Sequence, residues 1–131
     1  MQKKLKYNFK DKRGGIIDIF VNSPKDHCTI VTFNKNAVRG NHFHKKSTQY
    51  TFIVSGRLKL YRAKVDDNGN LKEKVRSDVV ETNELIEHPP YESHTFVAET
   101  SKATILAFAC GTRGGNFYEK DTFRLKKNLN V

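Results

Sequence analysis

The sequence predicts an all-β fold in a single domain. Runs rich in β-branched and aromatic residues are separated by turn residues, which recur roughly every eight to twelve positions. No stretch repeats apolar residues with the period of an amphipathic helix. A chain of 131 residues is long enough to bury one good hydrophobic core. We therefore expect one all-β barrel over about 14–110, followed by a C-terminal extension over 111–131.

Turn residues delimit each expected strand. Gly14 and Gly15 open the first one, and Asn68-Gly69 is the strongest two-residue hairpin signal in the chain. The run 103–109 is apolar on both faces, which predicts an interior strand. The expected strands are, in order, 16–21, 28–33, 39–44, 49–54, 57–65, 71–80, 84–86, 94–98 and 103–109.

The two ends of the chain lie outside this series. The run 6–9 is able to form a strand but has no obvious partner within the chain. It would then add to the sheet of a second copy, because open sheet edges must be paired or covered. We therefore expect a homodimer. Near the other end, we expect 121–127 to form a turn.

Composition and charge limit the partners. The formal net charge is +10, which favours an anionic partner. Nucleic acid is disfavoured, because the chain has no zinc-finger, helix-turn-helix or aromatic-basic RNA-binding motif. No apolar run approaches a membrane span or resembles a signal-peptide core, so we expect a cytoplasmic protein with no membrane partner. Cys28 and Cys110 lie far apart beside apolar residues, which predicts buried free thiols.

Two histidines form the centre of the candidate site. His42 and His44 are two positions apart in a predicted strand, so both imidazoles project from one face. A third imidazole, His94, follows a Pro-rich turn. Imidazoles on one surface suit either proton transfer near neutral pH or metal ligation. Arg39 and Lys45 beside them would supply cations for an anionic ligand.

These residues resemble the two sequence motifs of the cupin family. His42-x-His44, four residues, Gln49, six residues and Gly56 resemble the first motif, in which Glu usually stands where this chain has Gln49. The segment 89–94 resembles the second motif, with Tyr91 in place of the usual Gly, and Ala98 replaces the usual Asn. The resemblance implies a jelly-roll barrel, also called a double-stranded β-helix.

A narrower resemblance, carried by 11–15, 39–45 and 118–124, points to the sugar-nucleotide branch of the cupins. That branch contains the dTDP-sugar 3,4-ketoisomerases, the 3,5-epimerases that act on dTDP-4-dehydrorhamnose, and the cupin domains of capsular-polysaccharide enzymes. It implies an isomerase or epimerase of polysaccharide or deoxysugar biosynthesis. Such an enzyme removes a proton next to a keto group of a nucleoside diphosphate sugar and needs no cofactor.

The implied roles can be assigned residue by residue. The resemblance makes His42 the base. His44 or a tyrosine would face the developing enolate oxygen as a donor, and Tyr118 would return the proton. Arg39, Asn41 and Lys45 would bind the substrate.

The same side chains also suit a divalent metal. His42, His44, Gln49 and His94 would offer three imidazoles and an amide oxygen, a set compatible with Zn, Fe, Mn, Ni or Cu. The sequence leaves open whether a metal binds. It also leaves open a metal-dependent cupin enzyme acting on another small molecule, and a non-catalytic sugar-binding cupin, because a fold alone does not imply an activity.

Overall fold

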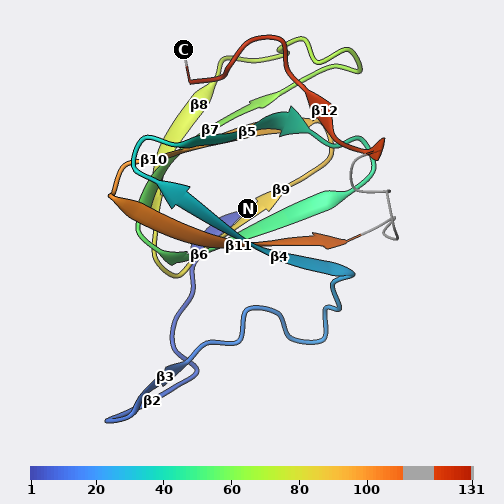
Figure 1. The fold of residues 1–131 in the computed structure, drawn as a ribbon. Helices are drawn as coiled ribbons and strands as arrows, with labels where there is room; N and C mark the ends of the chain where they lie inside the picture. Colours follow the sequence, from blue (N-terminus) through green and yellow to red (C-terminus); the bar gives the residue numbers. More distant parts are fainter. Residues whose placement is uncertain (111–119, 131) are drawn as a thin grey trace.

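The computed structural model describes residues 1–110 and 120–130. This part of the chain is almost entirely β, and contains no helix long and apolar enough to cross a membrane. It forms two five-stranded antiparallel sheets and a separate two-stranded hairpin (Figure 1). The strands are β1 Gln2–Lys4, β2 Phe9–Asp11, β3 Gly14–Ile16, β4 His27–Asn34, β5 Val38–Phe43, β6 Thr48–Ser55, β7 Arg57–Lys64, β8 Arg76–Glu81, β9 Glu84–His88, β10 Glu92–Ala98, β11 Lys102–Cys110 and β12 Phe123–Arg124. The all-β fold expected from the sequence is confirmed.

The two sheets face each other as the layers of a jelly roll. The β6 sheet has the order β1-β9-β6-β11-β4, and the β10 sheet has the order β12-β5-β10-β7-β8. Consecutive strands from β4 to β7 alternate between the layers, as do β9, β10 and β11, so the chain crosses the barrel repeatedly. In Figure 1 the β10 sheet lies above the β6 sheet, and the β2–β3 hairpin projects below both. β11 is an interior strand, as its apolar sequence predicts.

Two expected strands are shorter than their sequences suggest. Of the run 16–21 only Ile16 belongs to a strand; the chain then leaves the projecting hairpin and returns to the barrel, where Phe20 packs edge-on against Tyr50. The run 71–80 joins β7 only from Arg76 onward. Both segments have a composition that favours strands. How many of their residues pair depends on where the rest of the fold places them.

The chain ends also differ from expectation. The run 6–9 does find a partner within the chain, because Phe9 in β2 pairs with Ile16 in β3. The run 121–127 contains a short strand, β12, which adds to the edge of the β10 sheet beside β5. Together with β1, which pairs with β9, β12 brings residues from outside 14–110 into the two sheets.

Strand β4 illustrates how alternation sorts side chains between the inside and the outside. His27 lies on the inner face with Phe33, whereas Cys28 and Ile30 lie on the outer face. Cys28 is exposed, so the expectation of a buried thiol is wrong at this position. The side chain of Cys110 lies outside the described residues.

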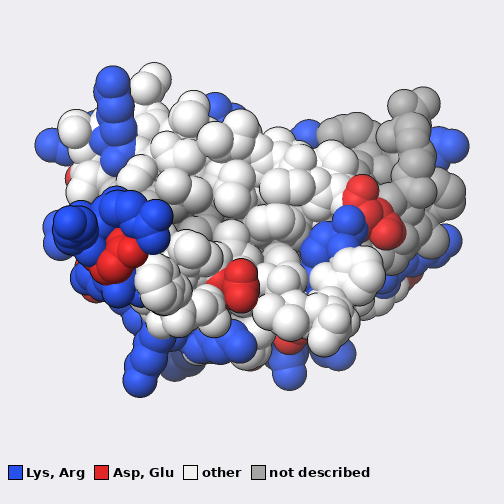
Figure 2. Space-filling model, turned by 90° about the horizontal axis from the view of Figure 1, so that it is seen from below, with Lys and Arg blue, Asp and Glu red and all other residues white. Residues whose placement is uncertain are grey.

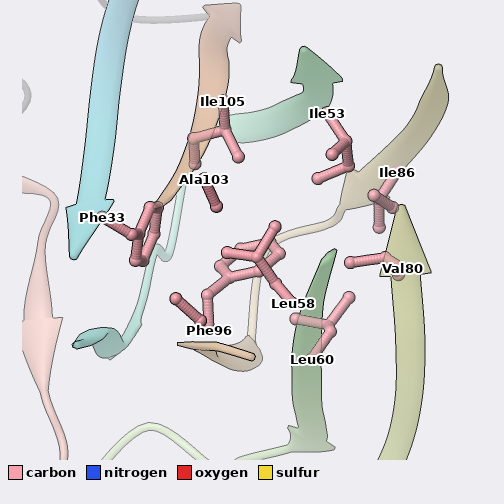
Figure 3. Close-up of a cluster of buried hydrophobic side chains, with 10 residues drawn as sticks. Phe33, Ile53, Leu58, Leu60, Val80, Ile86, Phe96, Ala103 and Ile105 are labelled. Atoms are coloured by element: carbon pink, nitrogen blue, oxygen red, sulfur yellow. The ribbon is translucent and has the colours of Figure 1, made fainter. Parts of the chain in front are cut away.

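The hydrophobic core fills one end of the barrel. Its side chains come from both sheets and point toward one another (Figure 3). On β6 and β10 the core residues lie further along each strand than the polar residues Gln49 and His94. The polar site therefore occupies the other end of the same interior. The buried core residues are Phe33, Ile53, Leu58, Leu60, Val80, Ile86, Phe96, Ala98, Ala103 and Ile105.

Candidate active site

In each sheet, four residues that pair across neighbouring strands form a row, and both rows lie at the same height along the barrel. Residues directly opposed in antiparallel strands place their side chains on the same face of the sheet. The row in the β6 sheet is His27, Ala109, Gln49 and His88, and the row in the β10 sheet is Arg124, His42, His94 and Arg62. The rings of His88 and His94 stack with their centroids 4.3 Å apart, so the two rows face each other across the interior.

A β-bulge aims Arg39 and His42 at the same side of β5. The pairing of β5 with β10 shifts by one residue here, which leaves Asn41 as the extra residue. Gly40 and Asn41 have φ values of 99° and 58°. A Cβ atom on Gly40 would lie 2.7 Å from the carbonyl oxygen of His94. Without the bulge, Arg39 and His42 are three positions apart and would face opposite sides.

The structure brings three histidines together. The ring centroids of His42 lie 5.1 Å from His44 and 4.8 Å from His94, and those of His44 and His94 are 5.8 Å apart. One nitrogen from each ring lies within 4.8 Å of the other two. The histidines therefore form one cluster, although His94 is far away in sequence.

His44 is held in place at both ring nitrogens. Its Nδ1 donates a hydrogen bond of 2.8 Å to the backbone carbonyl of Asp121, because a carbonyl oxygen can only accept. In neutral His44 the Nε2 atom then has a lone pair. The carboxamide of Gln49 lies 3.0 Å from Nε2, and satisfies it when its amide nitrogen is turned toward the ring. His44 thus has a fixed tautomer.

Asp121 also organises the turn after β5. Its carboxylate accepts backbone hydrogen bonds from Lys45, Lys46 and Ser47, at distances of 2.8–3.1 Å. Burial alone would raise the pKa of this carboxyl, but the bonds from Ser47, Lys45 and Lys46 outweigh it and lower the pKa. The C-terminal segment therefore fixes both the turn and the ring of His44.

In this cluster, the ring nitrogens of His42 and His94 have no hydrogen-bond partner among the described residues, and His42 is the less buried of the two. Both of its ring nitrogens are buried, and neither has a hydrogen-bond partner among the described residues. Burial lowers its pKa to about 4, with further contributions from the nearby charges of His44 and Arg124. His42 is therefore a neutral imidazole at neutral pH, with a free lone pair.

His88 is part of the site, although the strand expected from the sequence, 84–86, ends two residues before it. It ends β9, is 1% exposed, and its Nε2 lies 2.9 Å from the hydroxyl of Thr51. Burial and the nearby charge of Arg62 hold its pKa well below the ordinary value, and burial does the same for His94. The signal that was available is the two-residue spacing from Ile86, which is a core residue of the same strand.

A cavity of about 150 Å³ lies in front of the cluster. Its polar lining comes from both sheets, and its remaining wall is apolar. Arg39 lines it, with its Nε donating to the carbonyl of Thr32 at 3.2 Å and its guanidinium 5.6 Å from the centroid of Phe33. The polar lining residues are His27, Thr29, Arg39, His42, Gln49 and His94.

Two residues with expected roles, Lys45 and Asn41, lie away from the cavity. Lys45 does not line the cavity; its ammonium pairs with Asp67 at 3.3 Å and lies over the ring of Phe123. The carboxamide of Asn41 binds the C-terminal segment, donating to Asn128 at 3.0 Å and accepting from the backbone of Leu129. Tyr118 lies outside the described residues.

The three histidines offer suitable ligand atoms for a divalent metal, but their spacing is wider than a bound ion requires. A tetrahedral zinc site holds its nitrogens roughly 3.4 Å apart, so an ion would need the three rings to close in from their present spacing. The buried, unpartnered nitrogens of His42 suit a ligand role. Nε2 of His44 would ligate only if Gln49 gave up its contact with that atom.

Known proteins share this fold. The model of the polysaccharide biosynthesis C-terminal domain family matches residues 9–123. A comparison with curated protein sequences finds no significant match. Among solved structures, the sugar 3,4-ketoisomerase QdtA of Thermoanaerobacterium thermosaccharolyticum, in complex with TDP, is 20% identical with a TM-score of 0.71; the match covers 96% of this chain and 88% of that one.

Two further structures differ in length from this chain. NovW, a 4-keto-6-deoxy sugar epimerase of Streptomyces spheroides, is 15% identical with a TM-score of 0.71, over 86% of this chain and 64% of NovW. CapF, a capsular polysaccharide assembling protein of Staphylococcus aureus, is 17% identical with a TM-score of 0.66, over 94% of this chain and 34% of CapF. This chain thus spans less than two thirds of NovW and about a third of CapF. At these identities the likeness establishes the cupin jelly-roll fold.

Proposed function

From the chain's membership of the polysaccharide biosynthesis C-terminal domain family, we propose that it is a nucleotide-sugar isomerase or epimerase. The sugar epimerase and the TDP-bound ketoisomerase among the similar structures support this function. The observation that carries it is His42, a neutral and unpartnered imidazole that lines a cavity together with the guanidinium of Arg39. That combination suits removal of a proton from a carbon next to a keto group.

The size of the cavity supports a sugar ring as the reacting part. An engineered cavity of about this volume admits one six-membered ring, benzene. The pyranose would occupy the cavity, and the nucleoside diphosphate would remain at its mouth. Arg39, which also lines the cavity, would hold a phosphate, because a guanidinium forms paired, charge-assisted hydrogen bonds with phosphate oxygens.

The groups around His42 would stabilise the enolate. As His42 takes the proton, negative charge develops on the keto oxygen. Neutral His94 carries one N–H donor and lies on the same face of the β10 sheet as His42. Gln49, from the facing sheet, lines the same cavity. His44 holds Gln49 and is itself held by Asp121, so these donors are oriented before the substrate binds.

Turnover in D₂O tests this function. dTDP- and UDP-linked 4-keto-6-deoxyhexoses would be incubated with the protein and followed by proton NMR and mass spectrometry. We expect deuterium to enter at the carbon beside the keto group, together with an isomerised product. Binding of dTDP without exchange on any of these sugars would instead favour a non-catalytic sugar-binding cupin.

A second function, a metal-dependent cupin enzyme, has its own support. His42, His44 and His94 present three nitrogens within 4.8 Å, and both nitrogens of His42 are buried without a partner. These residues, joined by Gln49 once it turns, would hold the ion, which would polarise a carbonyl or a bound water as a Lewis acid. Elemental analysis of the purified protein tests this reading. A stoichiometric metal lost in His94→Asn would support it, and a metal-free, active protein would contradict it.

We also propose that the protein is a homodimer that uses the outer face of the β6 sheet. Viewed from the side of that sheet and the hairpin, Figure 2 shows a broad area without charged residues between the charged groups. Ile30 is 66% exposed on this sheet face, and Phe9 and Ile16 are exposed on the projecting hairpin. Two copies with a charge of +10 repel each other, which favours contact through an uncharged face.

Light scattering at micromolar concentration tests the dimer. Ile30→Asp should yield a monomer, because it buries an unpaired charge in the contact. Val79→Asp is the matched control, since Val79 is 51% exposed but belongs to the β10 sheet. A monomeric wild type, or equal effects of the two changes, would contradict the proposal.

A further inference from the structure

His27 lies on the wall of the cavity opposite His42. It begins β4 in the β6 sheet, whereas His42 belongs to β5 in the β10 sheet, and these sheets are the lower and upper layers of Figure 1. Both side chains line the same cavity of about 150 Å³. The strand expected from the sequence, 28–33, begins one residue after His27, whereas β4 includes it. Its place on the inner face of β4 makes it part of the site.

Small residues keep the space between the two walls open. Ala109 separates His27 from Gln49 in the row across the β6 sheet, and Ala107 is the next residue on the same inner face of β11. Both alanines line the cavity. A larger side chain at either position would fill the volume that a ring would take. A six-membered ring in this volume would therefore have His42 on the side of the β10 sheet and His27 on the side of the β6 sheet.

This placement bears on which reaction the site performs, given the proposed function. To shift a keto group, one base on one face suffices, because it can carry a proton between neighbouring carbons. To invert a carbon, a proton must leave one face and another must arrive at the opposite face. We infer that His27 is the second proton-transfer group and that the reaction is an epimerisation of a keto sugar.

The step balances without a redox partner. His42 takes the proton as the α C–H bond breaks, and the electron pair moves into the enolate. The imidazolium form of His27 then gives its proton to the same carbon from the other face, and the keto group is restored. His27 is half-buried and regains a proton from solvent, while His42 loses one. The hydroxyl of Thr29 lies 3.4 Å from both ring nitrogens of His27, on the same face of β4.

The test separates proton removal from inversion. In D₂O with a dTDP-4-keto-6-deoxyhexose, the wild type should yield an epimer that carries deuterium at the inverted carbon. In His27→Gln, His42 still removes the proton and returns deuterium to the same face. We therefore expect the recovered substrate to be deuterated at close to the wild-type rate, while the epimer forms more slowly by a factor of order 10²–10⁴.

Two further variants control for structure. Cys28→Ser changes the adjacent residue, which is exposed on the outer face of β4, and should leave both rates unchanged. His27→Asn provides a second substitution should the Gln variant lose its fold by circular dichroism.

Several outcomes would overturn the inference. Unimpaired epimer formation in His27→Gln would show that another group supplies the proton. Loss of exchange and inversion together would show that His27 only helps to bind the ring. A keto-shifted product without inversion would also overturn it, while leaving the proposed isomerase function intact. Absence of exchange in the wild type would remove the proposed function itself, and the inference with it.

Discussion

His42 and His44 lie two positions apart in the chain, and their surroundings give them different roles. His44 has both nitrogens engaged, one with the backbone of Asp121 and one with Gln49. His42 has a buried, unpartnered lone pair and a pKa of about 4. A group that is fixed by two hydrogen bonds suits an orienting role, whereas a free lone pair suits proton removal.

The two cations that flank the histidines should also differ. Arg39 lines the cavity, whereas Lys45 is paired with Asp67. Arg39→Ala should weaken dTDP binding at least tenfold, because it removes a charge-assisted contact worth about 1.5–3 kcal/mol. Lys45→Ala should change the affinity by less than about threefold, because its ammonium is already paired with Asp67 and does not line the cavity.

Isothermal titration calorimetry with dTDP measures both variants. Lys127→Ala, near the C-terminus, serves as a control for the loss of one general positive charge. Equal weakening by all three substitutions would indicate diffuse attraction and no defined phosphate contact.

At the scale of elements, short irregularities in regular strands position the site. The bulge at Gly40 and Asn41 turns Arg39 toward the cavity, and β12 delivers Asp121 to His44. Tyr91, where the cupin motif usually has Gly, adopts a φ of 62°. Its hydroxyl donates to Asp67 at 2.9 Å and its amide donates to the carbonyl of His44 at 2.7 Å, so these contacts compensate for the backbone conformation.

Gly40→Ala should disturb the bulge. A non-Gly residue at a φ of 99° costs about 1–2 kcal/mol, and its Cβ would also meet the carbonyl oxygen of His94 at 2.7 Å. We expect a loss of unfolding free energy larger than that backbone cost, together with reduced turnover. Denaturant unfolding measures the first quantity.

Gly69→Ala is the matched control for the bulge. Its φ is 83°, but its Cβ would meet only side-chain atoms at 3.4 Å. The variant should therefore lose only the unfolding free energy that corresponds to the backbone cost, and it should keep full turnover. Equal losses in the two variants would mean that the contact with His94 is unimportant.

The sequence predicts those parts of the site that follow from local periodicity. The two-residue spacing of His42 and His44 is one example, and the motif resemblance adds His94 and Gln49. Arg39 faces the cavity only because of the bulge, whose pairing partner is far away in the chain. His27 and His88 join the site through strand register, since Ala109 and Gln49 link them across the β6 sheet. Register between distant strands is not encoded in any short window of sequence.

The strands were predictable in the same partial way. Alternation and turn residues located most of the strands from β4 to β11, because each has a buried face. The same signals gave wrong strand lengths in two places. The apolar run 16–21 serves mainly as a connection, and 71–80 pairs only over its second half.

At the scale of the whole molecule, the barrel has a dry end and a polar end. The core cluster fills the first, and the histidine rows fill the second. His42, His88 and His94 all have pKa values lowered by burial. Burying neutral imidazoles makes the stability of the fold depend on pH, because the unfolded chain binds protons at a higher pH than the folded one.

The unfolding free energy should therefore decrease as the pH falls from about 6.5 toward 4. In this range the unfolded state takes up protons that the folded state does not. For His42, the difference between its ordinary value of 6.5 and about 4 corresponds to about 3 kcal/mol once both states are protonated. Denaturant unfolding at pH 7.5, 6 and 5 measures the trend.

His88→Phe provides the comparison for this trend. Phe keeps an aromatic ring against His94 but takes up no proton. The variant should therefore lose less unfolding free energy than the wild type between pH 7.5 and 5. An identical pH dependence in the two proteins would show that His88 does not resist protonation in the folded state.

The rate of α-proton exchange in His42→Asn tests the central claim, that His42 removes the proton, most directly. Asn keeps hydrogen-bonding capacity but accepts no proton at neutral pH. We expect exchange on a dTDP-4-keto-6-deoxyhexose in D₂O to fall by a factor of order 10²–10⁴, with dTDP binding retained and chelators without effect on the wild type. Exchange at the wild-type rate in His42→Asn would contradict the account. So would a chelator-sensitive wild type in which His42→Asn and His94→Asn both lose a bound metal.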